Sequence, residues 1–266
     1  MNATRAEISK LFTDISREFP MEDYYYREYF PRSINRYIDI LMLVPRISGG
    51  EALDVGCGYG DINIALTKLG YKVFATDLFT ITNGSIEDRM SKYNVTFQRH
   101  NIEAEALPFE DNCFDLVIFS EVLEHLNYSP LIPLQEIRRV LKNGGKLILS
   151  TPNIANSKAI AMLLMGRNVM FMDLERYYIT PKPIVWHNNL PFFNRHNRLY
   201  NTKELKQLVN RAGLKVDNIH YSYAPGSIGQ AKWKKAIHWI LGEALHFTQF
   251  SILGDFIVVV ATKEAI

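Results

Sequence analysis

Glu51-Ala-Leu-Asp-Val-Gly-Cys-Gly-Tyr-Gly-Asp61 is the stretch that decides the fold of this chain. An apolar run at 52–55 leads into a loop with glycine at positions 56, 58 and 60. Glycine lets the backbone turn sharply and lets its N–H groups approach a ligand closely. A second apolar run, 72–76, ends at Asp77. This order of strand, glycine loop, helix, strand and acid predicts a nucleotide-binding half-unit of an α/β sheet.

The spacing of the glycines separates two kinds of nucleotide site. A dinucleotide fingerprint, G-x-G-x-x-G, needs glycine at position 61, where this chain has Asp61. The loop is instead G-x-G-x-G, with Asp54 two residues ahead of it. This pattern resembles the first motif of class I S-adenosylmethionine (SAM) dependent methyltransferases, D/E-x-G-x-G-x-G.

Composition restricts the class of protein further. With 266 residues and 47% apolar content, the chain can bury a sizeable core. Its net charge of +2 gives no global attraction to nucleic acid. The two cysteines, Cys57 and Cys113, build neither a disulfide framework nor a metal spacing, which fits a reducing compartment. The N-terminus lacks the form of a signal peptide, and no run of about eighteen uncharged apolar residues occurs, so we expect a cytoplasmic protein without a spanning helix.

Helical and strand patterns alternate from about residue 33 to 150, which predicts a parallel sheet with helices on both faces. The expected strands are 52–55, 72–76, 95–99, 114–119, 146–150, 214–223 and 255–262. Helices are expected at 61–69 and 131–141, with a turn at 142–145. A further helix follows Asn201, with Thr202 as its N-cap and Gly213 as its stop.

Two regions do not follow this alternation of helices and strands. We expect a helical lead-in or lid at residues 1–48. We expect the methyltransferase domain at 49–266, with a substrate-cap insertion at 155–200. A peripheral loop is the alternative for that insertion, which is rich in proline and methionine (Met162, Met165, Met170, Met172). The lead-in carries an aromatic cluster that either packs in the core or forms a wall over the site: Tyr24, Tyr25, Tyr26, Tyr29 and Phe30. A helix near 232–244, which begins at Lys232, Lys234 and Lys235, is expected to pack on the sheet; weak contact with a membrane surface is the alternative.

The resemblance extends beyond the glycine loop. Four segments are similar to the type 11 and UbiG-like methyltransferases: 101–115, 120–126, 139–153 and 196–205. Together with the loop they cover roughly 50–155 and 195–220. The resemblance implies a Rossmann-like seven-stranded sheet in the order 3-2-1-4-5-7-6, with the last strand antiparallel.

The resemblance also implies SAM as the cofactor, and it implies which residues would bind each part of the SAM molecule. The loop amides would meet the methionine end, helped by a helix N-terminus, and Asp54 would order the loop or hold the ammonium through water. Asp77 would accept hydrogen bonds from the ribose, and Glu103 is an alternative to Asn101 for the adenine. The expected cofactor-binding residues are Asp54, Gly56, Cys57, Gly58, Gly60, Asp77, Leu78, Asn101, Ile102, Ser120 and Glu121.

Two histidines are the candidate catalytic residues. Transfer to a hydroxyl benefits from a general base, and His125, which follows the fourth strand, and His196 are expected in that role. His187 is a further candidate. The alternative is that His125 orients its loop.

A metal-free site is expected, with one alternative. Glu121-x-x-Glu124-His125 matches the metal ligands of quinone-precursor O-methyltransferases and of RNA 2′-O-methyltransferases, where a divalent ion polarises the acceptor oxygen.

Three functions follow from these patterns. The first is SAM-dependent methyl transfer to a small-molecule acceptor, at a hydroxyl of a sugar or polysaccharide precursor. The second is metal-assisted methylation of a quinone-type or RNA 2′-O acceptor. Nucleic acid is not the expected partner, because many of the basic residues near 195–215 fit the exposed side of a helix. The third is a non-catalytic SAM-binding partner subunit.

Overall fold

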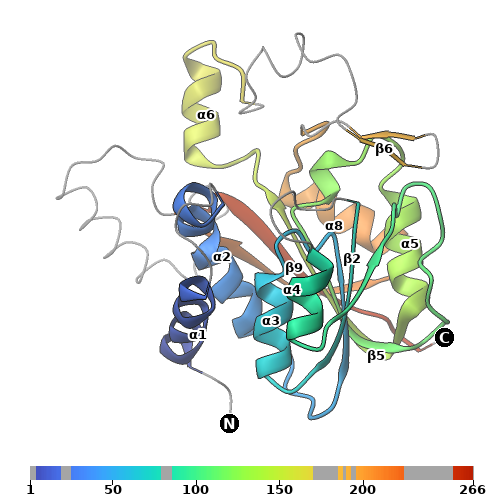
Figure 1. The fold of residues 1–266 in the computed structure, drawn as a ribbon. Coiled ribbons are helices and arrows are strands. Elements are labelled where there is room, and N and C mark those ends of the chain that lie inside the picture. Colours follow the sequence, from blue (N-terminus) through green and yellow to red (C-terminus); the bar gives the residue numbers. More distant parts are fainter. Residues whose placement is uncertain are drawn as a thin grey trace.

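The structure, a computed structural model, describes residues 4–18, 25–78, 86–169, 185–187, 190–192, 196–224 and 254–265. A seven-stranded sheet forms the centre, in the order β3-β2-β1-β4-β5-β9-β8 (Figure 1). β9 runs antiparallel to both of its neighbours, which confirms the predicted topology. The strands are β1 (Glu51–Val55), β2 (Lys72–Asp77), β3 (Thr96–Arg99), β4 (Phe114–Ser120), β5 (Leu141–Pro152), β8 (Lys215–Ser222) and β9 (Phe256–Thr262).

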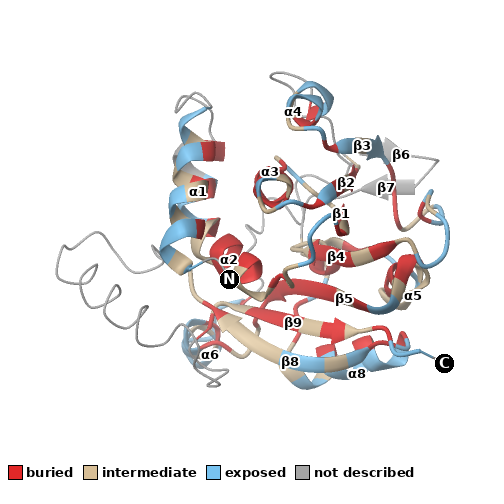
Figure 2. Cartoon of the chain, turned by 90° about the horizontal axis from the view of Figure 1, so that it is seen from below, coloured by how far each residue is buried: buried red, intermediate tan, exposed pale blue. Residues whose placement is uncertain are grey.

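Helices cover both faces of the sheet (Figure 2). One face carries α1 (Arg5–Arg17), α2 (Phe30–Leu43), α3 (Asp61–Lys68) and α4 (Ile86–Lys92), and the other carries α5 (Leu131–Val140) and α8 (Thr202–Arg211). Alternation within the strands supplies both cores, because successive side chains point to opposite faces. In β4, Leu116 and Ile118 join the first core, whereas Val117 and Phe119 join the second.

The glycine loop between β1 and α3 takes its shape from positions that other residues would strain. Gly56, Gly58 and Gly60 all have positive φ, at 80°, 54° and 79°. A Cβ at Gly56 would lie 2.2 Å from Val122, and one at Gly60 would lie 1.7 Å from Met90. The loop therefore packs tightly against the segment after β4 on one side and against α4 on the other.

Two local expectations differ from the structure in detail. β5 begins at Leu141, ahead of the expected turn, but its pairing with β4 jumps from Phe114–Leu141 to Leu116–Lys146, so the turn interrupts the ladder. The prediction that Thr202 caps α8 is wrong. Asn201 is the N-cap: its side chain accepts a hydrogen bond from the Glu204 amide, and the Glu204 carboxylate accepts one from the Asn201 amide. An Asn at this position completes a capping box, which stabilises the helix start.

The lead-in is helical in its described part, and its tyrosines contact the start of α3. A π-helix, η1 (Tyr25–Tyr29), joins α1 to α2 within the described residues 25–43. The hydroxyls of Tyr25 and Tyr26 donate hydrogen bonds to Asp61, over 2.5 and 3.0 Å. The Tyr25 ring also stacks on Tyr59 of the glycine loop, with ring centroids 3.6 Å apart. Tyr24 lies outside the described residues.

The region after β5 begins with α6 (Ser157–Leu164), which projects from the body of the molecule (Figure 1). Two short strands, β6 (Val185–His187) and β7 (Leu190–Phe192), pair with each other. Met170, Met172, the side chain of His187 and the expected helix near 232–244 lie outside the described residues.

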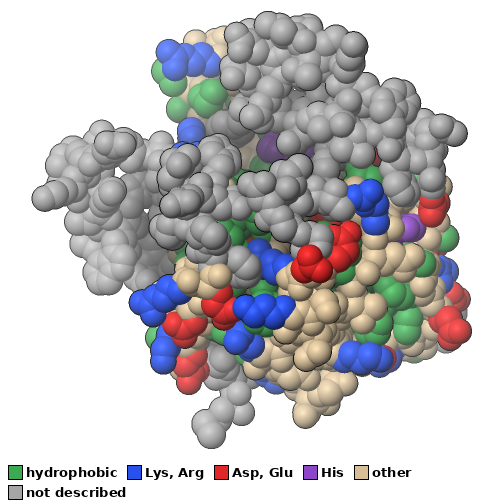
Figure 3. All heavy atoms as spheres, in the orientation of Figure 1, with side chains coloured by type: hydrophobic (Ala, Val, Ile, Leu, Met, Phe, Trp, Pro, Cys, Tyr) green, Lys and Arg blue, Asp and Glu red, His purple; other side chains and the backbone are tan. Residues whose placement is uncertain are grey.

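Two observations concern membrane spanning and surface charge among the described residues. Among the described residues, no helix is long and apolar enough to cross a bilayer. On the face shown in Figure 3, acidic and basic side chains of the described residues lie interspersed.

Candidate active site

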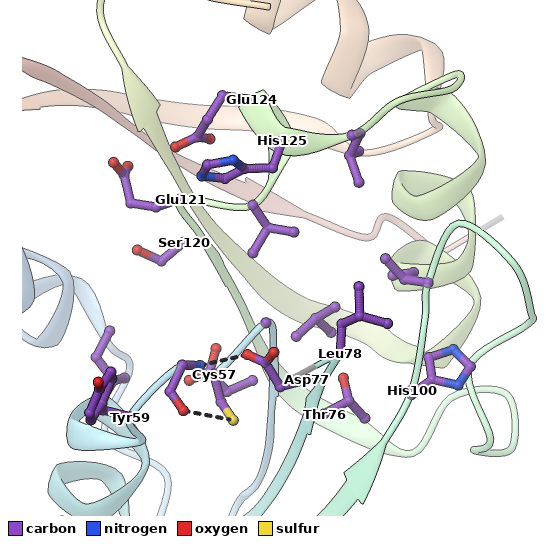
Figure 4. A pocket seen from close by; sticks show the side chains of 18 of the residues that line it. Cys57, Tyr59, Thr76, Asp77, Leu78, His100, Ser120, Glu121, Glu124 and His125 are labelled. Carbon is purple, nitrogen blue, oxygen red and sulfur yellow. Dashed lines mark hydrogen bonds between the residues drawn. The ribbon is translucent and has the colours of Figure 1, made fainter. Parts of the chain in front are cut away.

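A cavity of about 590 Å³ opens at the carboxyl ends of β1, β2 and β4. The strand order reverses between β1 and β4, and open α/β sheets bind ligands at such a switch point. Figure 4 shows two groups of side chains in the cavity: Asp77 and Leu78 toward one end, and Glu121, Glu124 and His125 toward the other.

The cavity collects nearly all of the residues expected from sequence. Of the expected cofactor-binding residues, Gly60 alone is not in the lining. Gly60 instead allows α3 to start against Met90, since any side chain there would collide with it. Both candidate catalytic histidines line the cavity as well: His125 and His196.

Asp77 ties the end of β2 to the glycine loop. Its Oδ2 accepts a hydrogen bond from the amide of Gly58 over 2.7 Å, and the residue is buried. Asn101 turns its side-chain oxygen to the Glu103 amide, at 3.0 Å. The Glu103 carboxylate accepts hydrogen bonds from the amides of Asn127 and Tyr128, so it holds the turn after η2 (Leu123–His125).

Four amides of the glycine loop already have partners within the chain. Gly56 and Cys57 both donate to the carbonyl of Thr76, and Gly60 donates to the carbonyl of Cys57. Gly58 donates to Asp77. These bonds fix the loop conformation and leave fewer of its N–H groups for a ligand.

Asp54, at the end of β1, is buried and lines the cavity. Burial, with the nearby negative charge of Asp77, raises the pKa of Asp54 to about 8. The side chain therefore carries a proton at neutral pH in the ligand-free protein, and a cation bound next to it would favour its ionised form.

At the second end of the cavity, Glu124 and His125 form a cluster with His196, which adds a second imidazole. One ligand atom from each of Glu124, His125 and His196 lies within 4.8 Å of the others. Burial, with His125 nearby, lowers the pKa of His196 to about 4, so its imidazole is neutral at physiological pH. Glu124 is fully buried; Thr151 donates to its Oε2, whereas Oε1 has no partner among the described residues. Burial, followed by the charge of Glu121, raises the pKa of Glu124.

Backbone hydrogen bonds bring His196 to this cluster from a distant part of the chain. The amides of Asn197 and Arg198 donate to the carbonyl of Glu124. The side chain of Asn197 donates to the carbonyl of His125 over 2.8 Å. The segment 196–198 is thereby fastened to η2, and the His125 and His196 rings lie 4.9 Å apart.

Glu121 stands apart from that cluster. Its backbone has a positive φ of 57°, a strained conformation for a non-glycine residue that is common at functional sites. Ser150 donates a hydrogen bond to its carboxylate, and Arg36 forms an ion pair with it at 3.5 Å. The three residues of the Glu121-x-x-Glu124-His125 pattern therefore do not form one set of ligands. Glu124 and His125 cluster with His196, whereas Glu121 pairs with Arg36.

Arg36 is a site residue that sequence reasoning missed. It lines the cavity from α2 and is 3% exposed. One signal could have revealed it: Arg36 falls on the face of α2 that Ser33, Tyr37 and Ile40 bury, by helical spacing. A charged residue on a buried helix face requires a partner there.

The fold and site define the class of this protein. A family model described as "Methyltransferase domain" matches residues 25–219, nearly three quarters of the chain. The chain belongs to this family, and its sheet order, glycine loop and Asp77 are those of a class I SAM-dependent methyltransferase.

Curated relatives resemble part of this chain. A segment of 118 residues is 35% identical to a ubiquinone biosynthesis O-methyltransferase of Cereibacter sphaeroides, covering 44% of this chain and 47% of that protein. A segment of 131 residues is 31% identical to the protein of the same name from Methylococcus capsulatus, covering 49% and 54%. An uncharacterised protein of Methanocaldococcus jannaschii is 41% identical over 101 residues, covering 38% and 40%. The chain spans about half the length of the curated relatives it matches.

Solved structures share the fold at low identity. A Haloferax volcanii methyltransferase, solved in complex with the Trm112 methyltransferase activator, matches with a TM-score of 0.60 and 16% identity over 99% of this chain and 100% of its own. A methyltransferase from Bacillus halodurans matches with a TM-score of 0.56 and 18% identity over 86% and 99%. These likenesses show the fold alone.

Proposed function

We propose that this protein transfers the methyl group of SAM to a hydroxyl oxygen of a small molecule. The observation that carries the proposal is the division of one cavity into two ends. One end contains Asp77 and Asn101, suited to a nucleoside, and the other contains Glu124, His125 and His196, suited to a hydroxyl. A donor and an acceptor bound at these ends would lie in one enclosed space.

SAM, when bound, supplies a methyl group already activated by its sulfonium. The protein's task is to position that methyl, align the acceptor oxygen with it and exclude water. Asp77 holds the ribose, and Tyr25 with Tyr29 forms part of the cavity wall. With SAM bound, the acceptor oxygen would form the new bond to the methyl carbon as the carbon–sulfur bond breaks with its electron pair left on sulfur, and His125 or His196 would accept the hydroxyl proton.

Two acceptor classes are supported by different observations. A sugar or polysaccharide precursor is supported by resemblance alone, because it suits the aromatic, methionine-rich segment expected as a cap and the motif at 196–205. The curated relatives named for ubiquinone biosynthesis support a phenolic hydroxyl instead. Both classes present a neutral hydroxyl to the same histidines.

A methyl-transfer assay with tritiated SAM, read as label incorporated into the acceptor, tests the proposal on the whole chain. SAM labelled in its methyl group is incubated with nucleotide-activated sugars, with catechols and with a short RNA. We expect label in a sugar or a catechol, and loss of most of it in His125→Ala and His196→Ala. His220→Gln, in β8 and outside the cavity lining, serves as the control. SAM affinity without transfer to any acceptor would instead favour a non-catalytic partner subunit, and transfer to RNA alone would contradict a small-molecule acceptor.

A second candidate is metal-assisted methylation. Glu124, His125 and His196 offer one carboxylate and two imidazoles, a donor set that suits a divalent ion. The unpartnered Oε1 of buried Glu124 fits this reading, because a buried carboxylate oxygen requires a proton, a donor or a cation. A bound ion there would polarise the acceptor hydroxyl.

Metal binding can be separated from the metal-free mechanism without turnover. Mn²⁺ is titrated into chelator-treated protein and followed by electron paramagnetic resonance. Saturable binding that Glu124→Gln weakens at least about tenfold, while Glu105→Gln leaves it unchanged, supports the metal. The absence of saturable binding, together with full transfer in chelator, supports the histidine base.

A further inference from the structure

Asn127 lies just after η2, and its side-chain amide joins the two ends of the cavity. Its Nδ2 donates to the Glu103 carboxylate over 3.1 Å, and its Oδ1 accepts a hydrogen bond from Nδ2 of Asn197 over 3.1 Å. Glu103 lines the cavity, whereas Asn127 and Asn197 lie outside its lining. Asn127 therefore connects a residue of the cavity wall to the segment that carries His196.

On the cofactor side of Asn127, Glu103 belongs to the turn that begins at Asn101. The Glu103 amide donates to the Asn101 side chain over 3.0 Å. Besides the Asn127 side chain, the Glu103 carboxylate accepts hydrogen bonds from two backbone amides, those of Asn127 at 2.7 Å and Tyr128 at 2.8 Å. A nucleoside that binds against residues 101–103 is thus separated from the segment 127–128 by one carboxylate.

On the histidine side of this link, Asn197 supplies hydrogen-bond donors to the end of η2. The last carbonyls of a helix have no partners within it. The Asn197 backbone amide donates to the Glu124 carbonyl over 2.6 Å. Its Nδ2 donates to the carbonyls of His125 and Leu126 over 2.8 and 3.3 Å. These bonds determine where His196, the preceding residue, lies relative to His125.

An amide is the side chain that fits the position between Glu103 and Asn197. It offers a donor to the carboxylate and an acceptor to the second amide at the same time. Asn197 donates to Asn127, which donates to Glu103, and hydrogen bonds arranged in such a chain strengthen one another. These bonds form a contiguous path between the two ends of the cavity, the kind of path that carries energetic coupling.

We propose that Asn127 is a positioning residue that couples the cofactor end of the cavity to the two histidines. A cofactor seated against 101–103 fixes the Glu103 carboxylate. Through Asn127 and Asn197, that carboxylate holds the histidines in the arrangement that receives the acceptor proton. Cofactor and acceptor therefore favour each other's binding. The catalytic part of this inference rests on the proposed function, which gives the histidines their role, whereas the coupling itself does not.

The test reverses the hydrogen bond between Glu103 and Asn127. Asn127→Asp alone places two carboxylates against each other, and Glu103→Gln alone sets two donors against each other, so each breaks the link. The double variant Glu103→Gln/Asn127→Asp restores it with opposite polarity, because the glutamine now donates to the aspartate. Asn197→Ala breaks the other link. The control is Asn210→Ala, at an exposed position of α8 outside the cavity lining.

Nuclear magnetic resonance of the ¹⁵N-labelled histidine side chains measures the coupling without turnover, after His125→Gln and His196→Gln have assigned the two signals. S-adenosylhomocysteine should shift both signals in the wild-type chain and in Asn210→Ala. We expect Asn127→Asp and Asn197→Ala to reduce the shifts at saturating ligand at least about threefold, and the double variant to restore them. In methyl transfer, Asn127→Asp should lower kcat about 10- to 100-fold and leave the KM for SAM within about threefold.

Three results would overturn the proposal. Full shifts in folded Asn127→Asp and Asn197→Ala would mean that the ligand reaches the histidines by direct contact. Absent shifts in a wild-type chain that binds the ligand would mean that the two ends of the cavity are independent. A double variant that folds, binds the ligand and still lacks the shifts would leave Asn127 with no positioning role.

Circular dichroism, thermal melting and isothermal titration establish that each variant is folded and saturated. Should Asn127→Asp not fold, Asn197→Ala and the double variant decide. Failure of the proposed function has a different signature, because the shifts and their pattern among the variants persist while no hydroxyl acceptor receives label. A wild-type chain that binds no S-adenosylhomocysteine would remove the SAM site, and the coupling with it.

Discussion

Asp77 connects the glycine loop to the proposed ribose position through a single carboxylate. One of its oxygens accepts the Gly58 amide, and the residue lines the cavity. Replacing it by Asn keeps the shape but removes the charge. We expect Asp77→Asn to weaken S-adenosylhomocysteine about 30-fold or more by isothermal titration. The control Asp88→Asn, at an exposed position of α4, should bind normally; unchanged affinity in Asp77→Asn would remove the basis of the SAM site.

Asp54 links ligand binding to pH and stability. Its pKa, raised to about 8 by burial and by Asp77, lies well above the value of about 3.9 in an unfolded chain. Between these values the folded state binds more protons, so the free energy of unfolding falls as pH rises through that range. We expect Asp54→Asn to exceed the wild type by about 1–3 kcal/mol at pH 8 and to match it near pH 4. Urea unfolding of the ligand-free protein across this range measures the difference; a pH-independent difference would contradict the shift.

At the scale of elements, the junction of the glycine loop and α3 depends on Gly60. A Cβ there would lie 1.7 Å from Met90 Cε, and the residue has a φ of 79°. Gly60→Ala should therefore cost about 2–4 kcal/mol from strain and overpacking. Gly58→Ala is the matched control, because it has a positive φ but no atom within 4 Å of the added Cβ. Its loss of unfolding free energy should be smaller, and Met90→Ala should recover part of the loss in Gly60→Ala.

The lead-in and α3 are joined through Asp61. Tyr25 donates to Asp61 over 2.5 Å, and both groups are buried. Tyr25→Phe removes that bond and the contact with Tyr37 while keeping the ring that stacks on Tyr59. We expect a loss of about 1–3 kcal/mol of unfolding free energy. A double-mutant cycle with Asp61→Asn should show coupling above about 0.5 kcal/mol, and additive losses would mean that the two groups do not act together.

The last strand, β9, connects β8 to the rest of the sheet. β9 lies between β5 and β8, and Lys263 just beyond it is buried. Its ammonium donates to the carbonyls of Arg139 and Leu141 and to Asn112. The segment just after β9 is thereby fixed to the junction of α5 and β5 and to Asn112, ahead of β4.

Removing that ammonium should weaken the sheet as a unit. We expect Lys263→Met to lower the unfolding free energy by about 2–4 kcal/mol, because one buried and two partly buried hydrogen bonds lose their donor. Lys215→Met removes an exposed pair with Glu264 and should cost less than about 1 kcal/mol. Chemical denaturation compares the two; equal losses would contradict a fixing role for Lys263.

The sequence by itself predicted those features of the protein that depend on residues close together in the chain. The glycines at 56, 58 and 60 have positive φ, a backbone conformation that favours glycine. Asp77 is the last residue of β2. Period-two and helical patterns placed the strands and most helices, and the family resemblance supplied their order. These features depend on neighbours a few residues away, which is the range over which backbone geometry restricts side-chain choice.

Only the tertiary structure decided which distant groups meet. Docking of 196–198 on η2 brings His196 to His125, and packing of α2 on the sheet puts Arg36 beside Glu121. The same packing places Tyr25 on Asp61 and so occupies the N-terminus of α3. No local pattern encodes these contacts, because each depends on burying two separate surfaces together, and a contact between them exists only once the sheet and both helical layers have formed.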